Sequence, residues 1–241
     1  MKKTLLLLFI VVSFGSLKAQ ESTESSSAGG IFIGAKAGYG ISNYESIIKD
    51  EKNFAKMTFK NLSYGILVGY KLSGPISFQL EGNFAQYGAR NIIPTYIYSP
   101  QSPILADYGT NSTVHRVDMD LFNVDVPLTV KLSLKEGTFS PYIYGGVNYG
   151  INIIGRASII REITYNDVVE YRKSTDDITA RIIQSEFAPI IGFGIKMEMV
   201  KVSFIGDIRY KYGITNLSNV DNYLGFTNSA LWISAGFFIY L

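Results

Sequence analysis

Apolar and polar residues alternate along most of the chain after residue 31. In residues 62–72 every second position is apolar, and the positions between are mostly serine, glycine or lysine. A period of two is that of a β-strand, whose successive side chains point to opposite faces. Eight segments of about ten residues repeat this pattern up to residue 241, with the length and period of membrane-spanning strands. The pattern therefore predicts an all-β fold.

The connections between these segments alternate in length. Short turns lie around residues 73–75, 135–137 and 199–200. The other connections are long and polar, roughly 42–61, 88–119, 156–185 and 216–229. Because this alternation is typical of outer-membrane barrels, we predict a closed eight-stranded antiparallel transmembrane β-barrel with short periplasmic turns and four long extracellular loops, in preference to a soluble β-sandwich. Strand-forming residues within 156–185 predict that part of this loop extends as a hairpin.

Aromatic residues collect near both ends of the predicted strands. The chain has 17 tyrosines and 15 phenylalanines but one tryptophan. Aromatic side chains form girdles at the two membrane–water interfaces of transmembrane barrels, whereas a sandwich would not require two such groups. The predicted outer girdle contains Tyr39, Tyr64, Phe84 and Tyr212, and the predicted inner girdle contains Tyr70, Phe78, Phe204 and Phe237.

The N-terminus has the features of a secretory signal peptide. Lys2 and Lys3 precede an apolar run over residues 5–14, and residues 17–19 offer a small-residue cleavage site. This run is shorter than the roughly 20 residues that a membrane-spanning helix needs. The predicted division of the chain is a signal peptide over 1–19, a flexible polar leader over 20–31 and an outer-membrane barrel domain over 32–241. The absence of cysteine excludes a lipid-modified N-terminal cysteine, disulfides and thiolate metal sites.

Charged residues fall on the strand face that would line the barrel interior. An eight-stranded barrel is about wide enough for side chains to fill it, and an unpaired buried charge is costly. We therefore expect salt bridges that plug the lumen, with a charged pore or proton path as the alternative. The predicted lumen charge network consists of Lys36, Lys71, Glu81, Asp125, Lys131, Asp207, Arg209 and Lys211.

Two prolines, Pro127 and Pro189, fall inside predicted strands. Proline has no backbone N–H to donate to a neighbouring strand, and a closed barrel has no free edge on which to place it. We therefore predict a local break in the ladder of hydrogen bonds at each proline.

The chain offers little for catalysis. The formal net charge of +2 gives no electrostatic reason for a nucleic-acid partner. The single histidine, His115, falls in the second long connection near Ser112, Asp118 and Asp120, where a barrel hydrolase or acyltransferase would place its catalytic rim. Such a neighbourhood also arises by chance in a polar loop, and one imidazole leaves no histidine pair for a metal ion. We expect no metal, no cofactor and no enzymatic activity.

Several segments resemble a known family. They are residues 33–38 (IGAKAG), 124–131 (VDVPLTVK), 141–146 (PYIYGG) and 207–216 (DIRYKYGITN), with a signal peptide that ends at 18–20 (KAQ). On these residues the chain resembles the PorT-like small outer-membrane β-barrel family of Bacteroidota over nearly all of its mature length. The resemblance implies a small barrel and, from the founding member, a role in secretion across the outer membrane. Pro127 matches the family pattern, whereas Leu241 stands where such barrels commonly end in an aromatic residue.

The sequence therefore indicates a non-enzymatic integral outer-membrane barrel that presents its extracellular loops to partners. An envelope scaffold, an adhesin and an accessory of a secretion complex all fit this description. A small channel or a solute-binding barrel is the alternative, and a rim enzyme that uses His115 is a more distant one. The expected partners are outer-membrane lipid, the barrel-assembly machinery and an envelope or secretion-complex protein.

Overall fold

The computed structural model describes residues 29–46, 56–72, 74–90, 92, 112–135, 137–165, 168–199, 202–219 and 225–241. The predicted signal peptide and most of the predicted leader lie outside these residues. The first strand begins at Gly30, within the last two residues of the predicted leader. No helix in the described part of the chain is long and apolar enough to cross a membrane.

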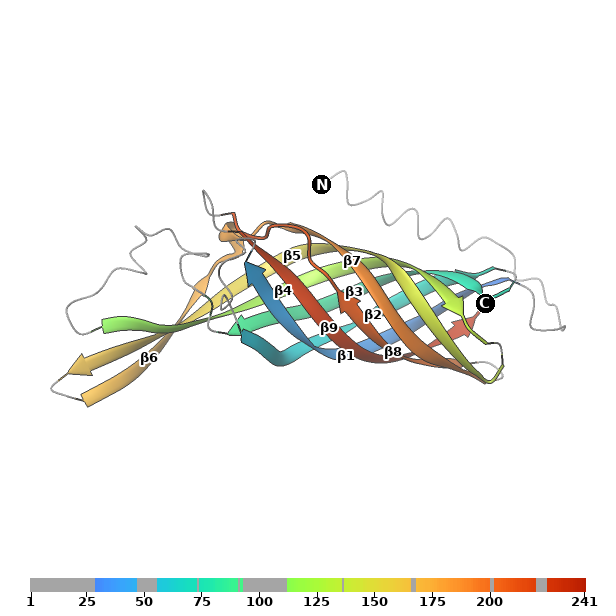
Figure 1. Ribbon diagram of the computed structural model, residues 1–241, viewed down its shortest axis with the longest axis horizontal. Helices are drawn as coiled ribbons and strands as arrows, with labels where there is room; N and C mark the ends of the chain where they lie inside the picture. The colour runs from blue at the N-terminus through green and yellow to red at the C-terminus, as the bar shows by residue number, and fades with distance from the viewer. Residues whose placement is uncertain are drawn as a thin grey trace.

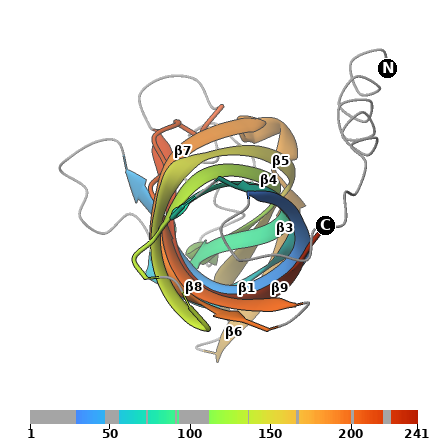
Figure 2. The ribbon, with the colours of Figure 1, turned by 90° about the vertical axis from the view of Figure 1, so that its right-hand side faces the viewer.

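Nine antiparallel strands form one sheet in the described residues. The strands are β1 (Gly30–Ser46), β2 (Lys56–Lys71), β3 (Ile76–Arg90), β4 (Ser112–Ser133), β5 (Phe139–Tyr165), β6 (Val168–Asp177), β7 (Ser185–Glu198), β8 (Ser203–Lys211) and β9 (Phe226–Tyr240). Eight of them follow the order β4-β3-β2-β1-β9-β8-β7-β5, and a β4–β5 ladder closes the ring (Figure 2). The predicted eight-stranded antiparallel barrel is thus confirmed.

The alternation of the sequence becomes an alternation between the inside and the outside of the ring. In β3 the side chains of Gln79, Glu81 and Asn83 are buried in the interior, whereas Phe78, Leu80 and Phe84 are exposed on the outer surface. Large exposed hydrophobic residues cover this outer surface on every strand of the ring. An outer surface of this kind suits lipid, where every backbone N–H and C=O must be paired within the ring.

The two ends of the barrel differ. At one end, which we call the turn end, four or five residues separate β2 from β3, β4 from β5 and β7 from β8, and Leu241 lies at the same end. The Leu72 N–H donates to the Ile76 carbonyl and the Met199 N–H to the Val202 carbonyl, which close the first and third of these short turns. Gly74 and Gly137 adopt positive φ angles of 101° and 136° in the first two of these turns, a conformation that glycine adopts without strain. The opposite end carries the longer connections and is called the arm end.

The strands at the arm end are longer than the sequence pattern predicts. β4 has 22 residues and β5 has 27, so that, with β6, most of the predicted loop 156–185 is strand, as are residues 112–119 at the end of the predicted loop 88–119. Residues 112–120 of β4, 156–165 of β5 and 168–177 of β6 form a three-stranded sheet that extends away from the ring (Figure 1). We call this sheet the arm, and its β5–β6 hairpin confirms the hairpin predicted in this loop.

The connection predicted at 42–61 is also shorter than expected. β1 continues to Ser46 and β2 starts at Lys56, which takes up much of the predicted loop 42–61. The connection predicted at 216–229 keeps its length but lies four residues earlier, because β8 ends at Lys211 and β9 starts at Phe226. Polar residues in these stretches resemble loop sequence, but the neighbouring strands satisfy their backbone groups and keep them extended.

Both prolines lie at breaks in the ladders. The β3–β4 ladder pairs Leu80 with Leu128 and Asn83 with Asp125, but it skips Pro127 and its neighbour between them. The β7–β8 ladder starts at Ile190, one residue after Pro189. The predicted interruption is present inside the ladder at Pro127, whereas Pro189 lies at the end of its ladder, and each proline still pairs with a residue of β5 on its other side.

The interior of the ring has three layers. A small apolar cluster that includes Phe32, Leu67 and Phe238 lies toward the turn end. A larger cluster that includes Leu121, Phe226 and Trp232 lies toward the arm end. Charged and polar side chains occupy the layer between the two clusters. The lumen is therefore a packed core, as expected for eight strands.

Two glycines on adjacent strands allow a test of this packing. At Gly192, which faces the interior, an added Cβ would lie 2.5 Å from both the Ile208 carbonyl oxygen and the Tyr144 hydroxyl. At Gly145, on the outer surface, the nearest atom to an added Cβ is 3.8 Å away. We predict that Gly192→Val lowers the free energy of unfolding by about 1–3 kcal/mol and that Gly145→Val changes it little. Urea unfolding of the refolded barrel in lipid vesicles measures both, and equal losses would contradict a tightly packed lumen.

Candidate functional site: the lumen and the arm

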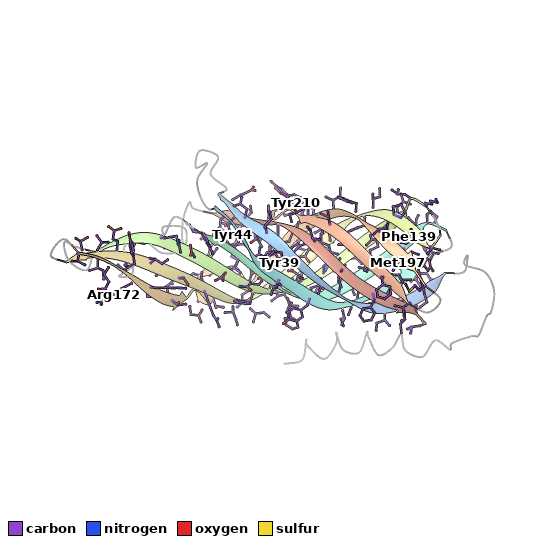
Figure 3. All side chains as sticks on the ribbon, turned by 90° about the horizontal axis from the view of Figure 1, so that it is seen from below. Tyr39, Tyr44, Phe139, Arg172, Met197 and Tyr210 are labelled. Atoms are coloured by element: carbon purple, nitrogen blue, oxygen red, sulfur yellow. The ribbon has the colours of Figure 1, made fainter. Side chains whose placement is uncertain are left out.

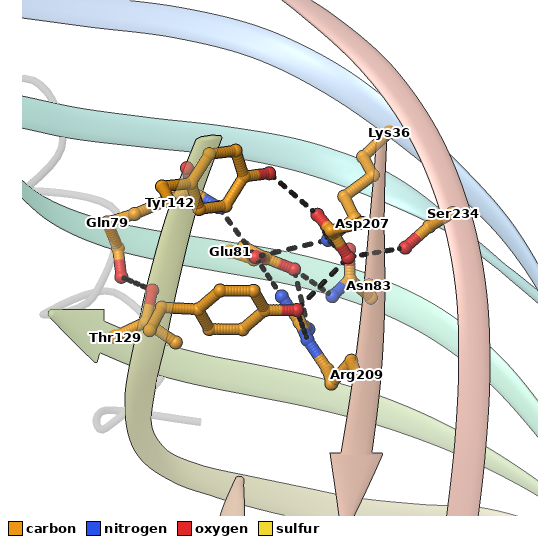
Figure 4. A network of polar contacts seen from close by, with 10 residues as sticks. Lys36, Gln79, Glu81, Asn83, Thr129, Tyr142, Asp207, Arg209 and Ser234 are labelled. Carbon is orange, nitrogen blue, oxygen red and sulfur yellow. Dashed lines mark hydrogen bonds and ion pairs between the residues drawn. The ribbon is translucent and has the colours of Figure 1, made fainter. Parts of the chain in front are cut away.

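Two ion pairs form the centre of the lumen (Figure 4). Arg209 of β8 donates from both terminal nitrogens to Glu81 of β3, with Nη1 lying 2.9 Å from Oε2. Lys36 of β1 lies 2.8 Å from Asp207 Oδ2 and 3.9 Å from Glu81 Oε1. These side chains come from three separate parts of the ring, so that the network ties opposite walls together.

Neutral donors complete the coordination of both carboxylates. The side-chain amides of Gln79 and Asn83 donate to Glu81 at 2.6 and 2.9 Å. The hydroxyls of Tyr142, Tyr144 and Ser234 donate to Asp207 at 3.2, 3.0 and 2.9 Å. A buried ion is tolerable only when its remaining lone pairs are also bonded, and here they are.

A second charged group lies nearer the arm end. Lys211 donates to Glu186 Oε2 at 2.9 Å, and its ammonium lies 3.9 Å from the centre of the Tyr87 ring. The Tyr87 hydroxyl donates to Asp125. The register of β4, β5 and β7 places Asp125 and Glu186 on either side of Gly150, whose missing side chain leaves room for both carboxylates.

Most of the predicted lumen charges come together in these groups. Seven of the eight predicted residues are buried, and Lys71 is half-buried at the turn end. Glu186 was not predicted, because the residue lies next to a segment interpreted as a loop. Extending the alternation of Phe187, Pro189 and Ile191 back by one residue places Glu186 on the inner face. With Glu186 included, the buried charges in the described residues are four cations and four carboxylates, namely Lys36, Lys131, Arg209, Lys211, Glu81, Asp125, Glu186 and Asp207.

Apolar side chains close the lumen at the arm end. Residues 178–184, which include the short helix η3 (Thr179–Arg181), cross this end and meet residues 213–219. The Ile183 N–H donates to the Leu217 carbonyl at 2.8 Å, and the Asn219 N–H donates to the Arg181 carbonyl at 2.9 Å. Ile178 and Leu217 are fully buried beneath this crossing, against the cluster that contains Trp232.

The cavities inside the lumen are small. One beside Asp125, Asn148 and Lys211 has a volume of about 30 Å³, and one near Lys71 and Lys131 has a volume of about 40 Å³. On this measure a cavity needs about 10–15 Å³ to hold one water molecule, so that each of these holds a few waters at most. Cavities of this size have no room for a sugar or an amino acid.

The predicted girdle residues all lie on the outer surface, with between 44% and 61% of their surface exposed. Several are cross-strand partners. Tyr70 pairs with Phe78, and Phe204 pairs with Phe237, toward the turn end. Tyr64 pairs with Phe84 farther along the strands, with ring centres 5.9 Å apart. Their role at the two membrane interfaces stays a prediction.

The arm presents an open sheet edge. β5 pairs with one edge of β6, and no strand in the described residues pairs with its other edge. Val168, Val169 and Tyr171 of β6 are largely exposed. Figure 3 shows Arg172 on this arm, with Phe139 and Met197 at the opposite end of the molecule. A row of unpaired N–H and C=O groups is a template for another strand.

Polar contacts fix the base of the arm. Arg181 donates to Asp176 at 2.7 Å, and the Thr179 N–H donates to Asp177 Oδ1 at 2.9 Å. Hydrogen bonds from the Thr179 side chain and backbone hold the pKa of Asp177 below its ordinary value, so this carboxylate stays ionised at neutral pH. β6 is therefore tied to η3 and to the closed mouth of the barrel.

The backbone of His115 belongs to β4, at the bulge between Val114 and Arg116 in the β4–β5 ladder. The prediction that placed His115 in a loop is therefore wrong, because pairing with β5 keeps this stretch extended. Its side chain lies outside the described part of the structure, so that its participation in catalysis stays untested.

The ion pair between Glu81 and Arg209 provides a test of the prediction that salt bridges plug the lumen. Glu81→Gln keeps the shape of the side chain but leaves Arg209 without its buried partner, and we predict a loss of about 3–5 kcal/mol in the free energy of unfolding. Replacing both Glu81 and Arg209 by methionine removes equal and opposite charges and is expected to recover most of this loss. Urea unfolding in lipid vesicles measures the three proteins, with Glu170→Gln, in an exposed pair with Arg172, as the control. A single variant as stable as the control would contradict the proposed plug.

The apolar closure predicts how the protein behaves toward ions. Refolded protein in a planar bilayer is expected to produce no stable open channel, because buried side chains fill the lumen and the crossing segments cover one end. Current recordings at symmetrical salt concentrations test this, with an established porin as the positive control. Sizeable, long-lived current steps that scale with the amount of protein would contradict it.

Several solved structures are similar to this chain at low sequence identity. Neisserial surface protein A has 13% identity and a TM-score of 0.45, with 88% of this chain and 97% of that chain covered. OprG of Pseudomonas aeruginosa has 11% identity and a TM-score of 0.48, with coverage of 92% and 100%. The outer membrane protease OmpT of Escherichia coli has 9% identity and a TM-score of 0.41, with coverage of 92% and 100%. A search of curated proteins found no match.

A match to a family model assigns the chain to a protein family. The model described as "Outer membrane protein beta-barrel domain" matches residues 18–219, which is most of the chain. The matched residues include the strands that carry the lumen charges and the whole arm. The chain thus belongs to the outer membrane protein beta-barrel domain family and is a small outer-membrane β-barrel protein.

Proposed function

We propose that this barrel is a non-enzymatic protein that presents its arm outside the cell to a partner protein. The observation that carries the proposal is the open edge of β6, which stands beyond the ring with no neighbour in the described residues. At about 3.4 Å per residue, the ten residues of β6 offer an edge roughly 34 Å long. An edge of this length accommodates a strand from another protein.

The composition of β6 supports strand addition by a folded or extended protein segment. Exposed Val169 and Tyr171 provide apolar contacts, and Glu170, Arg172 and Lys173 provide charges of both signs. Main-chain hydrogen bonds supply affinity in this mode of binding, and alternate side chains supply specificity. The mixed charge also discourages indiscriminate pairing between copies, since edge charges are a common protection against aggregation.

The lumen supports the same proposal because it has little space for a conducting pore or a bound solute. The ion pairs at the centre of the lumen, the apolar closure and the cavities of about 30 and 40 Å³ disfavour the alternatives of a channel and a solute-binding barrel. The function then falls to the parts that project from the membrane. A rim enzyme that uses His115 stays the distant alternative.

The kind of partner follows from the resemblance noted in the sequence. A PorT-like role as an accessory of a secretion complex fits an arm that meets another envelope protein, and so does a role as an envelope scaffold or adhesin. The barrel itself would meet outer-membrane lipid and the barrel-assembly machinery. A secretion role predicts that a deletion strain loses export of its cargo, and normal export would contradict that role alone.

Photo-cross-linking in living cells tests the arm. A photoreactive phenylalanine analogue at Tyr171, which is 57% exposed on β6, is expected to cross-link one discrete protein. The same analogue at Tyr64, equally exposed but on the lipid-facing wall, is the control and is expected to give no such product.

A truncated arm provides the second half of this test. Ile159 and Ser174 are cross-strand partners, so that an Asn-Gly turn can replace residues 160–173 and join them directly. We expect the shortened protein to refold as a barrel and to lose the cross-linked product when the analogue is placed at Thr175. The proposal fails if β6 positions give no specific product in the full-length protein, or if the product survives truncation.

A further inference from the structure

Three lysines line one hollow at the turn end of the lumen. Lys71 comes from β2, Lys131 from β4 and Lys196 from β7, and the ring brings them to the same cavity of about 40 Å³. Ser77 and Ser133 line the same cavity with their hydroxyl-bearing side chains. We call this hollow the lysine vestibule. It lies beside the short turns, and therefore on the side predicted to face the periplasm.

Lys131 is the deepest of the three. Only 6% of its surface is exposed, and in the described residues no carboxylate lies within 4 Å of its ammonium. Its nearest electron-rich groups are the faces of Tyr142 and Tyr144, whose ring centres lie 4.7 and 5.6 Å away. A ring face offsets only part of the cost of burying an ammonium ion.

The charges around the vestibule do not balance. Glu81 is held by Arg209, Asp207 by Lys36, and Glu198 by Lys196 at 2.8 Å. No carboxylate in the described part of the chain pairs with Lys71 or Lys131. From the central ion pairs to the turn end, the described lumen residues include five cations and three carboxylates, an excess of two cations: Lys36, Lys71, Lys131, Lys196 and Arg209 against Glu81, Glu198 and Asp207.

We propose that the lysine vestibule binds a small anion, either a free halide or a carboxylate such as that of an acidic side chain. Lys131 supplies a buried ammonium without a carboxylate partner, and Lys71 and Lys196 line the hollow from two other strands. The serine side chains add neutral donors. The bound anion offsets the excess positive charge that the protein leaves in this half of the lumen. The size of the hollow limits the ligand to one such group, which excludes a nucleotide or a sugar phosphate.

Bromide provides the probe for the site, because its anomalous scattering identifies it in a crystal. Crystals of the refolded full-length barrel soaked in sodium bromide are expected to show an anomalous peak within ion-pair distance of Lys131 Nζ, about 4 Å. In Lys131→Met crystals the peak is expected to disappear. Lys173→Met, in the exposed strand β6, is the matched control and is expected to keep it.

The melting temperature in solution shows whether bromide binds outside the crystal as well. Bromide is expected to raise the melting temperature of the wild-type barrel by about 2–4 °C relative to a bulky organic sulfonate at the same ionic strength, because a ligand that binds only the folded state stabilises it. Lys131→Met is expected to show no such difference. The proposal is overturned if wild-type crystals show no peak at Lys131, or if both proteins respond equally to bromide.

Acetate distinguishes the two sources of the anion. If carboxylates share the site, equimolar acetate lowers the bromide peak at Lys131 to about half or less. An undiminished peak would overturn the carboxylate part of the proposal and leave a halide site. Neither result depends on the arm, so that these experiments can fail or succeed independently of the proposed partner binding.

Discussion

Lipid offers no hydrogen bonds, so a strand that crosses a membrane needs a paired neighbour on each side. The β4–β5 ladder meets this requirement by joining the two strands that would otherwise be the free edges of the ring. It is the longest ladder of the barrel, with pairs from Ser112–Ile163 to Ser133–Tyr142. The outward apolar faces, the filled lumen and the arm all follow from this closure.

Closing the sheet with eight strands makes the interior narrow, and the narrow interior determines its chemistry. Side chains that point inward must fill a space that excludes bulk water, so each charge there needs a partner close by. Arg209 and Glu81 meet across the lumen, and Lys36 reaches Asp207 171 positions away in the sequence. The ion pairs are therefore a consequence of the narrow ring, and they are not by themselves a sign of an activity.

Much of this architecture could be predicted from the sequence, since one physical signal, the period of two, fixes both the strands and the side of the wall on which each residue lies. Lys36, Glu81 and Arg209 were found in this way without knowledge of the pairing. Which cation meets which carboxylate depends on register between distant strands, and the sequence does not carry that information.

The alternation of apolar and polar positions did not identify strands or interior residues where both faces of a strand have similar polarity. Toward the arm end the inner face is apolar too, so Leu121 and Trp232 gave no alternation to indicate an interior cluster. In the arm, charged residues such as Arg172 and Lys173 resemble a solvated loop, and only pairing with β5 makes that stretch a strand. Glu186 was missed for the same reason, at the boundary between a recognised strand and an assumed loop.

The continuity of β5 has a mechanical consequence. Its 27 residues run from the turn end through the wall of the barrel into the arm. At the junction the Ile178 N–H donates to the Gly155 carbonyl, and the Gly155 N–H donates to the Thr179 hydroxyl. The barrel wall thus fixes the direction of the β6 edge, and this edge is already ordered before a partner binds. Binding to such a preorganised edge loses less conformational entropy than binding to a loose loop of equal length. A bound protein would also be held at one fixed tilt to the membrane, and a pull on it would act on the barrel wall through a single unbroken strand.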